Sequence, residues 1–345
     1  MTKLPGVTGW DVGGVNTKAA RLMPDGAGPA PRSVCLPYEV QRDPGALASV
    51  LAAASREIGG EPDDLHAITM TAELSQAFRT KREGVGYVLD AIEAVFPGDR
   101  LYLYTVQGRF VRPVEGRANP FAVGASNWVA TASWVARTVP TCVLIDIGTT
   151  SSDLIPIIEG KVAAQGHTDP ERLLSGELVY SGALRTPAEA VSRQVPLWGG
   201  KAAVSADGFA LIGDAHLWLG RLSDAEYTCP APDGRPANRL YAGERLARMV
   251  CADRDMLDDS AISHIATALA QAQLRTLTLA LERILRRWPV IRLAVVTGLG
   301  DFVAAEAARA AGLSVLPLTS HWGPAARIAP AAAVAWLLQD FLTLR

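Results

Sequence analysis

Two short stretches of the sequence repeat one pattern of residues that could bind phosphate. The first runs from Gly9 to Lys18, and the second runs from Val143 to Leu154. In each, an apolar run leads to an aspartate, one further residue, a glycine and then small polar residues. Glycine allows close backbone approach and positive φ, and an aspartate at a strand end can hold a divalent cation directly or through water. The pattern predicts two phosphate-binding turns, with Asp11 and Asp146 as catalytic residues and magnesium ligands.

Each turn offers backbone amides and polar side chains to the phosphate oxygens. The expected contacts are Gly13, Gly14, Val15, Asn16 and Thr17 in the first turn, and Gly148, Thr149, Thr150 and Ser151 in the second. Lys18 is a candidate catalytic cation, although strand alternation leaves open whether it faces the phosphate or solvent. An ordinary hairpin turn is the alternative for either stretch alone. The repetition, 135 positions apart, favours a duplicated architecture whose turns face each other across a cleft.

Further polar residues follow expected strands, at the place where open α/β sheets bind ligands. Candidate substrate contacts are Asn127, Glu177, Tyr180 and Arg185, and candidate proton acceptors are Glu73 and Asp214. Each alone is more often a helix cap or a solvated group. His216 is expected at the surface, and its spacing of two from Asp214 argues against a shared zinc site.

The expected elements place these residues in two halves of an α/β protein. In the first half, the residue pattern predicts an opening hairpin, a third strand, a helix over 44–58, a strand over 66–71, a helix over 84–96 and a strand over 101–106. The second half restarts at residue 141 with strands, continues through a loop-rich segment and closes in β-α-β-α order. A chain of 345 residues favours two domains, which we expect at 1–139 and 140–345.

The composition argues against several classes of binding partner. The 33 Lys and Arg nearly balance the 35 Asp and Glu, which argues against nucleic acid or an acidic membrane surface as partners. The four cysteines lack metal-type spacing, and no signal peptide or membrane-spanning apolar run is visible. A cytoplasmic protein that acts on small molecules is therefore expected. The oligomeric state, a homo-oligomer included, stays open.

The two aspartate motifs resemble the first and second phosphate motifs of the sugar kinase, heat-shock protein and actin superfamily. Gly298-Leu299-Gly300 resembles its adenosine-side turn, with Leu299 in place of a small residue. The resemblance implies an α/β, two-lobed actin-like ATPase (ribonuclease H-like) fold with duplicated mixed sheets flanked by helices. The first lobe would carry phosphate motif 1, and the second lobe would carry motif 2 and the adenosine-type turn.

A narrower resemblance joins the chain to the hydantoinase/oxoprolinase branch, through Thr69-Met70-Thr71-Ala72-Glu73-Leu74. Ala118-Asn119-Pro120, Ser126-Asn127-Trp128 and Gly182-Ala183-Leu184-Arg185-Thr186-Pro187 resemble a group within it that accompanies tetrahydromethanopterin-linked one-carbon metabolism and methylofuran biosynthesis. That resemblance implies an Mg²⁺-dependent alkyl transfer. An aminomethylfuran-methyl diphosphate would lose pyrophosphate to the phenol oxygen of a glutamyl-tyramine or tyrosine-type acceptor.

Two other classes stay open at this point. One is an ATP-dependent small-molecule kinase or hydantoinase/oxoprolinase-type ATPase, which would seat ATP or ADP at Gly298, Leu299 and Gly300. The other is a non-catalytic nucleotide-binding regulator. Small loops separate kinases, hydrolases and synthases on one fold, so the fold does not decide among them.

Overall fold

The structure is a computed structural model that describes residues 5–23 and 31–344. The chain forms two compact units. The first unit contains Met1–Leu144, Ile155–Leu174 and Pro317–Arg345, and the second contains Ile145–Leu154 and Ser175–Leu316. The units therefore differ from the expected division at residue 139, because two later segments pack with the N-terminal part of the chain.

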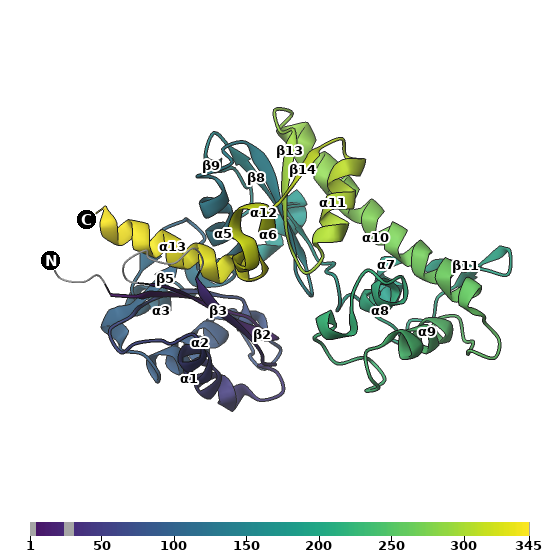
Figure 1. The fold of residues 1–345 in the computed structure, drawn as a ribbon, viewed down its shortest axis with the longest axis horizontal. Helices are drawn as coiled ribbons and strands as arrows, with labels where there is room; N and C mark the ends of the chain where they lie inside the picture. Colours follow the sequence, from purple (N-terminus) through teal and green to yellow (C-terminus); the bar gives the residue numbers. More distant parts are fainter. Residues whose placement is uncertain (1–4, 24–30, 345) are drawn as a thin grey trace. The chain divides into compact units, whose positions relative to one another are not determined.

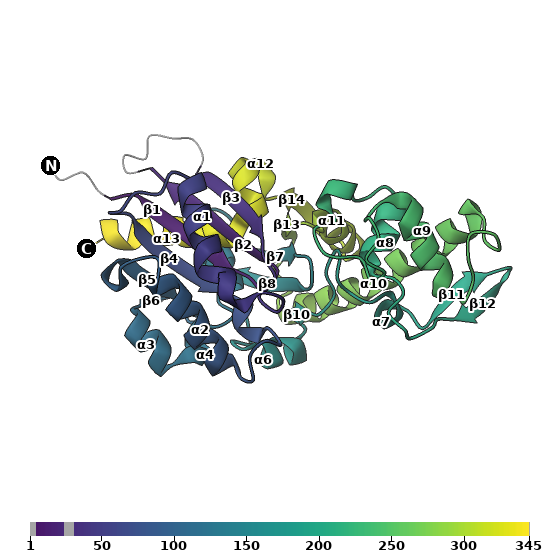
Figure 2. The ribbon, with the colours of Figure 1, turned by 90° about the horizontal axis from the view of Figure 1, so that it is seen from below.

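The first unit is built on a six-stranded sheet in the order β3-β2-β1-β4-β5-β6, whose strands lie side by side in Figure 2. The strands are β1 (Val7–Val12), β2 (Asn16–Leu22), β3 (Arg32–Pro37), β4 (Leu65–Met70), β5 (Leu101–Tyr104) and β6 (Phe110–Val111). β1 pairs antiparallel with β2 and parallel with β4, with Val12 opposite Met70. The segments that follow β1 and β4 therefore leave the sheet at the same edge.

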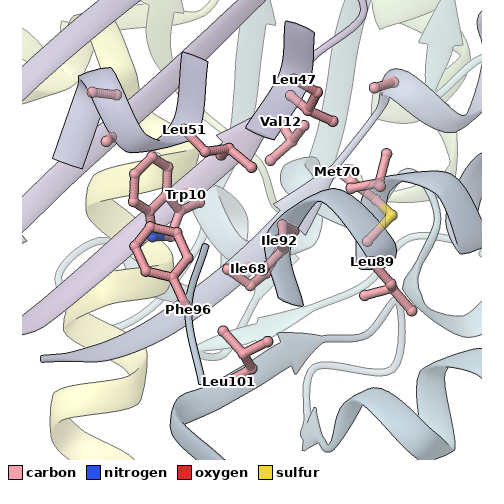
Figure 3. Packing of buried hydrophobic residues seen from close by; sticks show 14 of the residues in the cluster. Trp10, Val12, Leu47, Leu51, Ile68, Met70, Leu89, Ile92, Phe96 and Leu101 are labelled. Carbon is pink, nitrogen blue, oxygen red and sulfur yellow. The ribbon is translucent and has the colours of Figure 1, made fainter. Parts of the chain in front are cut away.

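Helices cover both faces of this sheet. α1 (Leu47–Glu57) and α2 (Lys81–Glu93) lie on one face, and α13 (Ala329–Thr343) lies on the other (Figure 1). Because side chains alternate along a strand, Trp10 and Val12 share the α1 and α2 face. Figure 3 shows them packed there against residues such as Leu51, Ile68 and Phe96.

α13 joins the first unit because it is apolar on nearly every side. Its small residues pack against β1 and against α5 (Asn127–Val135), where Trp134 stacks on Trp336 with ring centroids 5.4 Å apart. Gly9 permits the close crossing, since a Cβ atom there would lie 2.0 Å from the carbonyl oxygen of Ala331.

The second sheet has the order β10-β8-β7-β13-β14, with β9 paired to β8. Its strands are β7 (Cys142–Ile147), β8 (Ser152–Ile158), β9 (Lys161–Val162), β10 (Leu178–Val179), β13 (Leu293–Gly298) and β14 (Ser314–Pro317). The long helix α10 (Asp259–Arg287) packs against α8 (Ile212–Trp218), α9 (Arg239–Arg248) and α11 (Asp301–Ala310). A separate hairpin pairs β11 (Gln194–Leu197) with β12 (Gly200–Ala203).

Short elements complete the chain. They are α3 (Pro113–Ala118), α4 (Pro120–Val123), α6 (Asp169–Ser175), α7 (Ala188–Val191), α12 (Thr319–Trp322) and the 3₁₀ turns η1 (Pro44–Ala46), η2 (Ala72–Leu74), η3 (Gly98–Arg100), η4 (Asp224–Glu226) and η5 (Gly323–Ile328). Within the described residues, every helix is too short or too polar to cross a membrane.

The observed elements confirm the predicted fold class, α/β with two mixed sheets flanked by helices. The β-β-β-α-β-α order of the first half is present. β10 is only two residues long, because the segment after it braces a turn through its backbone. The β11–β12 hairpin and α6 were not predicted.

Candidate functional site

The two predicted turns have the same closure. In the first turn (Gly13–Asn16), the Gly13 amide donates to the Asn16 carbonyl oxygen at 3.0 Å, and in the second (Gly148–Ser151), the Gly148 amide donates to the Ser151 carbonyl oxygen at 3.0 Å. All residues of both turns are partly exposed.

The middle amides of both turns are available to a ligand. Those of Gly14 and Val15, and those of Thr149 and Thr150, donate no hydrogen bond to the described part of the chain. Outward amides of this kind suit an anion. The sequence-predicted phosphate contacts are thus brought together within each turn.

One predicted reason for the glycines is wrong. Neither Gly13, Gly14 nor Gly148 has a positive φ. Gly13 is needed instead for close approach, because a Cβ atom there would lie 2.7 Å from the Asn16 carbonyl oxygen. A Cβ atom at Gly14 would meet nothing within 4 Å, which leaves that side of the turn open.

Asp11 lies in β1 directly opposite Lys18 in β2. Lys18 Nζ is 3.3 Å from Asp11 Oδ2, while the buried Asp11 Oδ1 accepts no hydrogen bond from the described residues. Magnesium takes one or two protein carboxylates and fills its remaining positions with water and phosphate oxygens. An unbonded buried carboxylate oxygen beside open turn amides fits that need, so Asp11 can hold the ion. Lys18 is paired with Asp11 here.

Asp146 lies near the end of β7, beside the adenosine-type turn of the same unit. Gly298 has φ +92°, and a Cβ atom there would lie 2.5 Å from Asp146 Oδ1 and 2.3 Å from the Ile147 carbonyl oxygen. Gly300 donates its amide to that carbonyl at 2.9 Å. The Leu299 side chain packs in an apolar cluster with residues such as Leu184 and Leu217. Leu299 therefore has a packing role that accounts for its size.

The second turn is braced by the segment that follows β10. The amide of Ala183 donates to the Gly148 carbonyl oxygen at 2.9 Å, and the amides of Leu184 and Arg185 donate to the Thr149 carbonyl oxygen at 3.1 and 2.9 Å. Gly182 allows this contact, since a Cβ atom there would lie 2.5 Å from the Thr150 amide nitrogen.

Gln273 in α10 fastens this bracing segment from behind. Its Nε2 donates to the Gly182 carbonyl oxygen at 2.7 Å and to Ser181 Oγ at 2.9 Å. Its Oε1 accepts from His216 Nε2 at 2.8 Å. Burial lowers the pKa of His216 to about 4, so the imidazole is neutral at pH 7. His216 is fully buried, and the prediction that it lies at the surface is wrong.

Asp214 has its carboxylate engaged on several sides. It accepts from Arg245 Nε at 2.9 Å, from Tyr227 Oη at 3.2 Å and from the Leu211 amide at 2.8 Å, and it is fully buried. Burial raises its pKa, and the Arg245 guanidinium opposes that rise. These contacts favour a structural role for Asp214 over proton transfer.

Glu73, in contrast to Asp214, has a buried carboxylate without hydrogen bonds to the described part of the chain. It is 1% exposed, and neither carboxylate oxygen forms a hydrogen bond with the described residues. Lys81 Nζ is 3.8 Å from Oε1. Burial raises the pKa of Glu73 to about 7, with Lys81 opposing the rise and Asp169 adding to it. A carboxyl with a pKa near the working pH suits a general acid or base.

The four candidate substrate contacts differ in availability. Glu177 is fully buried and pairs with Arg287, Oε1 to Nη2 at 3.1 Å, which favours a packing role over the expected contact with substrate. Tyr180 and Arg185 are exposed, and Asn127 is partly exposed at the start of α5.

Sequence reasoning missed the buried partners of these residues. Gln273 could have been found, because it is a lone amide among the apolar positions of α10. Arg245 and Arg287 gave no comparable signal, since their partners Asp214 and Glu177 lie far away in the sequence.

Comparisons with known proteins show the family to which the chain is similar. A family model described as hydantoinase/oxoprolinase matches residues 64–341. A protein of Methanocaldococcus jannaschii named (4-{4-[2-(gamma-L-glutamylamino)ethyl]phenoxymethyl}furan-2-yl)methanamine synthase is 32% identical over 338 residues, which is 97% of this chain and 98% of that protein. A protein of Methanococcus vannielii with the same name is 29% identical over 209 residues, which is 59% of this chain and 93% of that protein.

Among solved structures, a nucleotide-free acetone carboxylase is similar with a TM-score of 0.63 and 12% identity, over 95% of this chain and 69% of that one. At this identity the likeness concerns the fold alone, and it agrees with the actin-like α/β class. The family match covers most of the chain, and the methanogen relative extends the match to nearly all of it. The chain therefore belongs to the hydantoinase/oxoprolinase family.

Proposed function

We propose that this protein is a transferase of methylofuran biosynthesis. It joins an aminomethylfuran-methyl diphosphate to the phenol oxygen of a glutamyl-tyramine or tyrosine-type acceptor and releases pyrophosphate. The observation that carries the proposal is the 32% identity, across 97% of the chain, to a synthase whose name describes a phenoxymethyl-furan methanamine. An aryl ether of that kind forms when a phenol oxygen takes a furan methylene carbon.

The bonds and charges balance without a further reactant. The bond between the methylene carbon and the diphosphate oxygen breaks, and its electron pair leaves with the pyrophosphate. The phenol oxygen forms the new bond to that carbon and loses its proton. Because the furan ring stabilises positive charge at the methylene carbon, the main demand on the protein is to stabilise the leaving group.

The two turns supply groups for that task. Outward amides at Gly14, Val15, Thr149 and Thr150 can donate to diphosphate oxygens. Asp11 and Asp146 are the proposed ligands of Mg²⁺, which when bound would offset the negative charge of the diphosphate. Glu73 is the proposed proton acceptor, because its carboxylate oxygens are unbonded whereas those of Asp214 are occupied.

An ATP-dependent reaction is the second candidate, and one observation favours it. The glycine geometry of the adenosine-type turn is intact, with Gly298 at φ +92° and the partly buried Leu299 packed against an apolar cluster. An adenosine site therefore remains compatible with this chain. This candidate would predict consumption of ATP during product formation.

The test supplies the furan diphosphate, γ-glutamyl-tyramine and Mg²⁺, with and without ATP, and measures ether product and pyrophosphate together. We expect equal amounts of both products, at the same rate in the two arms. Product that forms only with ATP, with ADP or AMP beside it, would move the assignment to the second candidate. Nucleotide binding with no product in either arm would favour a non-catalytic regulator.

A further inference from the structure

The first unit contains a group of buried polar side chains that the turns do not use. We define the Glu73 cluster as Glu73, Ser126 and Trp128 together with the charged residues Lys81, Asp169 and Arg172. All six belong to the first unit. Glu73 lies on η2 directly after β4, and Ser126 and Trp128 lie at the start of α5.

Three residues of the cluster have buried polar atoms without a hydrogen-bond partner among the described residues. These atoms are both carboxylate oxygens of Glu73, Ser126 Oγ and Trp128 Nε1. The three residues are at most 3% exposed. Leaving a buried polar group unsatisfied is costly, so such groups are uncommon without a purpose.

The backbone around Glu73 is built to hold it closely. A Cβ atom at Gly84 would lie 2.4 Å from the Glu73 carbonyl oxygen, and one at Gly124 would lie 3.1 Å from Glu73 Oε1. The amides of Glu73 and Ala125 favour the charged carboxylate but do not reach it as well-formed hydrogen bonds. Ala125 has φ +52°, a conformation that costs energy for a residue with a side chain and that often marks a functional site.

The charged residues form a chain of alternating sign. Lys81 Nζ is 3.8 Å from Glu73 Oε1 and 2.7 Å from Asp169 Oδ2, and Arg172 Nη1 is 3.9 Å from Asp169 Oδ1. The Arg172 guanidinium carbon lies 4.1 Å from the centroid of the Trp128 ring.

The unbonded atoms indicate the chemistry of the ligand. The carboxylate oxygens of Glu73 can accept a hydrogen bond, and Ser126 Oγ and Trp128 Nε1 can donate one, so the cluster fits a group that both donates and accepts. A neutral hydroxyl is such a group. One face of the Trp128 ring is already covered by Arg172, so the hydrogen bonds would give the site its selectivity.

The cluster also lies beside the first turn within the same unit. The amide of Thr71 donates to the Val12 carbonyl oxygen at 2.9 Å, and Thr71 Oγ1 would be 3.6 Å from a Cβ atom at Gly13. Glu73 follows Thr71 by two residues. A hydroxyl held by Glu73 would therefore lie at the sheet edge that carries the phosphate-binding turn.

We propose that Glu73, Ser126 and Trp128 form the binding site for the phenolic hydroxyl of the acceptor substrate. The choice of a phenol rests on the proposed function, whereas the choice of a neutral hydroxyl rests on the cluster itself. Glu73 accepts the hydrogen bond, Ser126 and Trp128 donate to the oxygen, and Lys81, itself paired with Asp169, holds the carboxylate in place.

The test compares two probes that differ by one hydroxyl, tyramine and phenethylamine. Their dissociation constants are measured by calorimetry for the wild type, Ser126→Ala and Trp128→Phe. We expect the wild type to bind tyramine at least about tenfold more tightly than phenethylamine, the scale of one satisfied buried polar group. In each variant the preference should fall severalfold, with phenethylamine affinity unchanged.

Serine at position 133, which lies later in α5 outside the cluster, provides the matched control. Ser133→Ala should keep the wild-type preference for tyramine. Equal binding of the two probes by the wild type, or an unchanged preference in both cluster variants, would overturn the inference. Magnesium pyrophosphate is titrated in parallel. If magnesium pyrophosphate binds but the preference for tyramine is absent, the hydroxyl site is contradicted and the proposed function is not. If magnesium pyrophosphate does not bind, the proposed function is contradicted as well.

Discussion

Gln273 donates its side-chain amide to the carbonyl oxygen of Gly182 at 2.7 Å, and so ties the middle of α10 to the segment that braces the second turn. The same nitrogen reaches Ser181 Oγ at 2.9 Å, and the amide oxygen accepts from His216. Neither Gln273 nor His216 is expected to touch the substrate. Gln273 is therefore a positioning residue for the second turn.

Gln273→Leu should raise the KM for the diphosphate substrate about tenfold, since a turn without its brace places its amides less well. The control is Gln271→Leu, the same change at an exposed position of the same helix, which should keep the wild-type KM. Steady-state kinetics and thermal melting are measured together. A loss of melting temperature with an unchanged KM would show that Gln273 only stabilises the fold.

Asp11→Ala and Asp146→Ala should each lower kcat more than about 100-fold, because each removes a proposed ligand of the magnesium ion that balances the leaving group. Neither change leaves a large apolar cavity, so the melting temperature should stay close to that of the wild type. Asp99→Ala, in an exposed turn, is the control for loss of an aspartate. Near-normal rates at saturating Mg²⁺ would mean that the two aspartates only shape their turns.

Asp214→Asn should destabilise the protein by up to about 3 kcal/mol, since it breaks a buried ion pair and leaves Asp233, which is partly exposed, as the remaining counter-charge of Arg245. Asp259→Asn, at an exposed pair with Arg239, should cost less than about 1 kcal/mol. Urea unfolding measures both. A stable Asp214→Asn protein that has lost activity would restore Asp214 as a proton acceptor.

Glu73 should make stability depend on pH. Its pKa is about 7 in the folded protein, above the ordinary glutamate value, so the folded state binds more protons than the unfolded state between these values. The contribution of Glu73 to the free energy of unfolding is therefore fully present at acidic pH and is lost as the pH rises through 7. The free energy of unfolding falls by at most about 1.4 kcal/mol per pH unit.

Glu73→Gln removes this loss, and its unfolding free energy should fall less than that of the wild type between pH 5 and 8. The groups that face Glu73 are Lys81 and Asp169, which remain in the variant. Glu57→Gln, exposed on α1, is the control and should follow the wild-type curve. Parallel curves for the wild type and Glu73→Gln would show that Glu73 titrates normally.

Much of the fold could be predicted because its signals are local. Alternating apolar residues and glycine turns predicted the strands β1 to β5 in their order along the chain. The repeated aspartate and glycine pattern predicted two turns of one kind, and their matching closures confirm that they are alike. Phosphate binding by these turns stays a prediction.

The roles of buried polar residues could not be predicted, because their partners lie far away in the sequence. The sequence around Glu177 is typical of a loop, and only the structure shows its ion pair with Arg287. The sequence allows a catalytic role for Asp214, and only the structure shows its buried ion pair with Arg245. The placement of α13 against β1 likewise depends on the missing side chain of Gly9, which only the packed structure reveals.

The most direct test of the proposed alkyl transfer follows the phenol oxygen. An acceptor labelled with oxygen-18 in its phenol group is incubated with the furan diphosphate and Mg²⁺ without nucleotide, and both products are analysed by mass spectrometry. Transfer of the furan methylene carbon predicts that the ether keeps the label and that the pyrophosphate carries none. An unlabelled ether, or an ether that forms only after ATP is added, would contradict it.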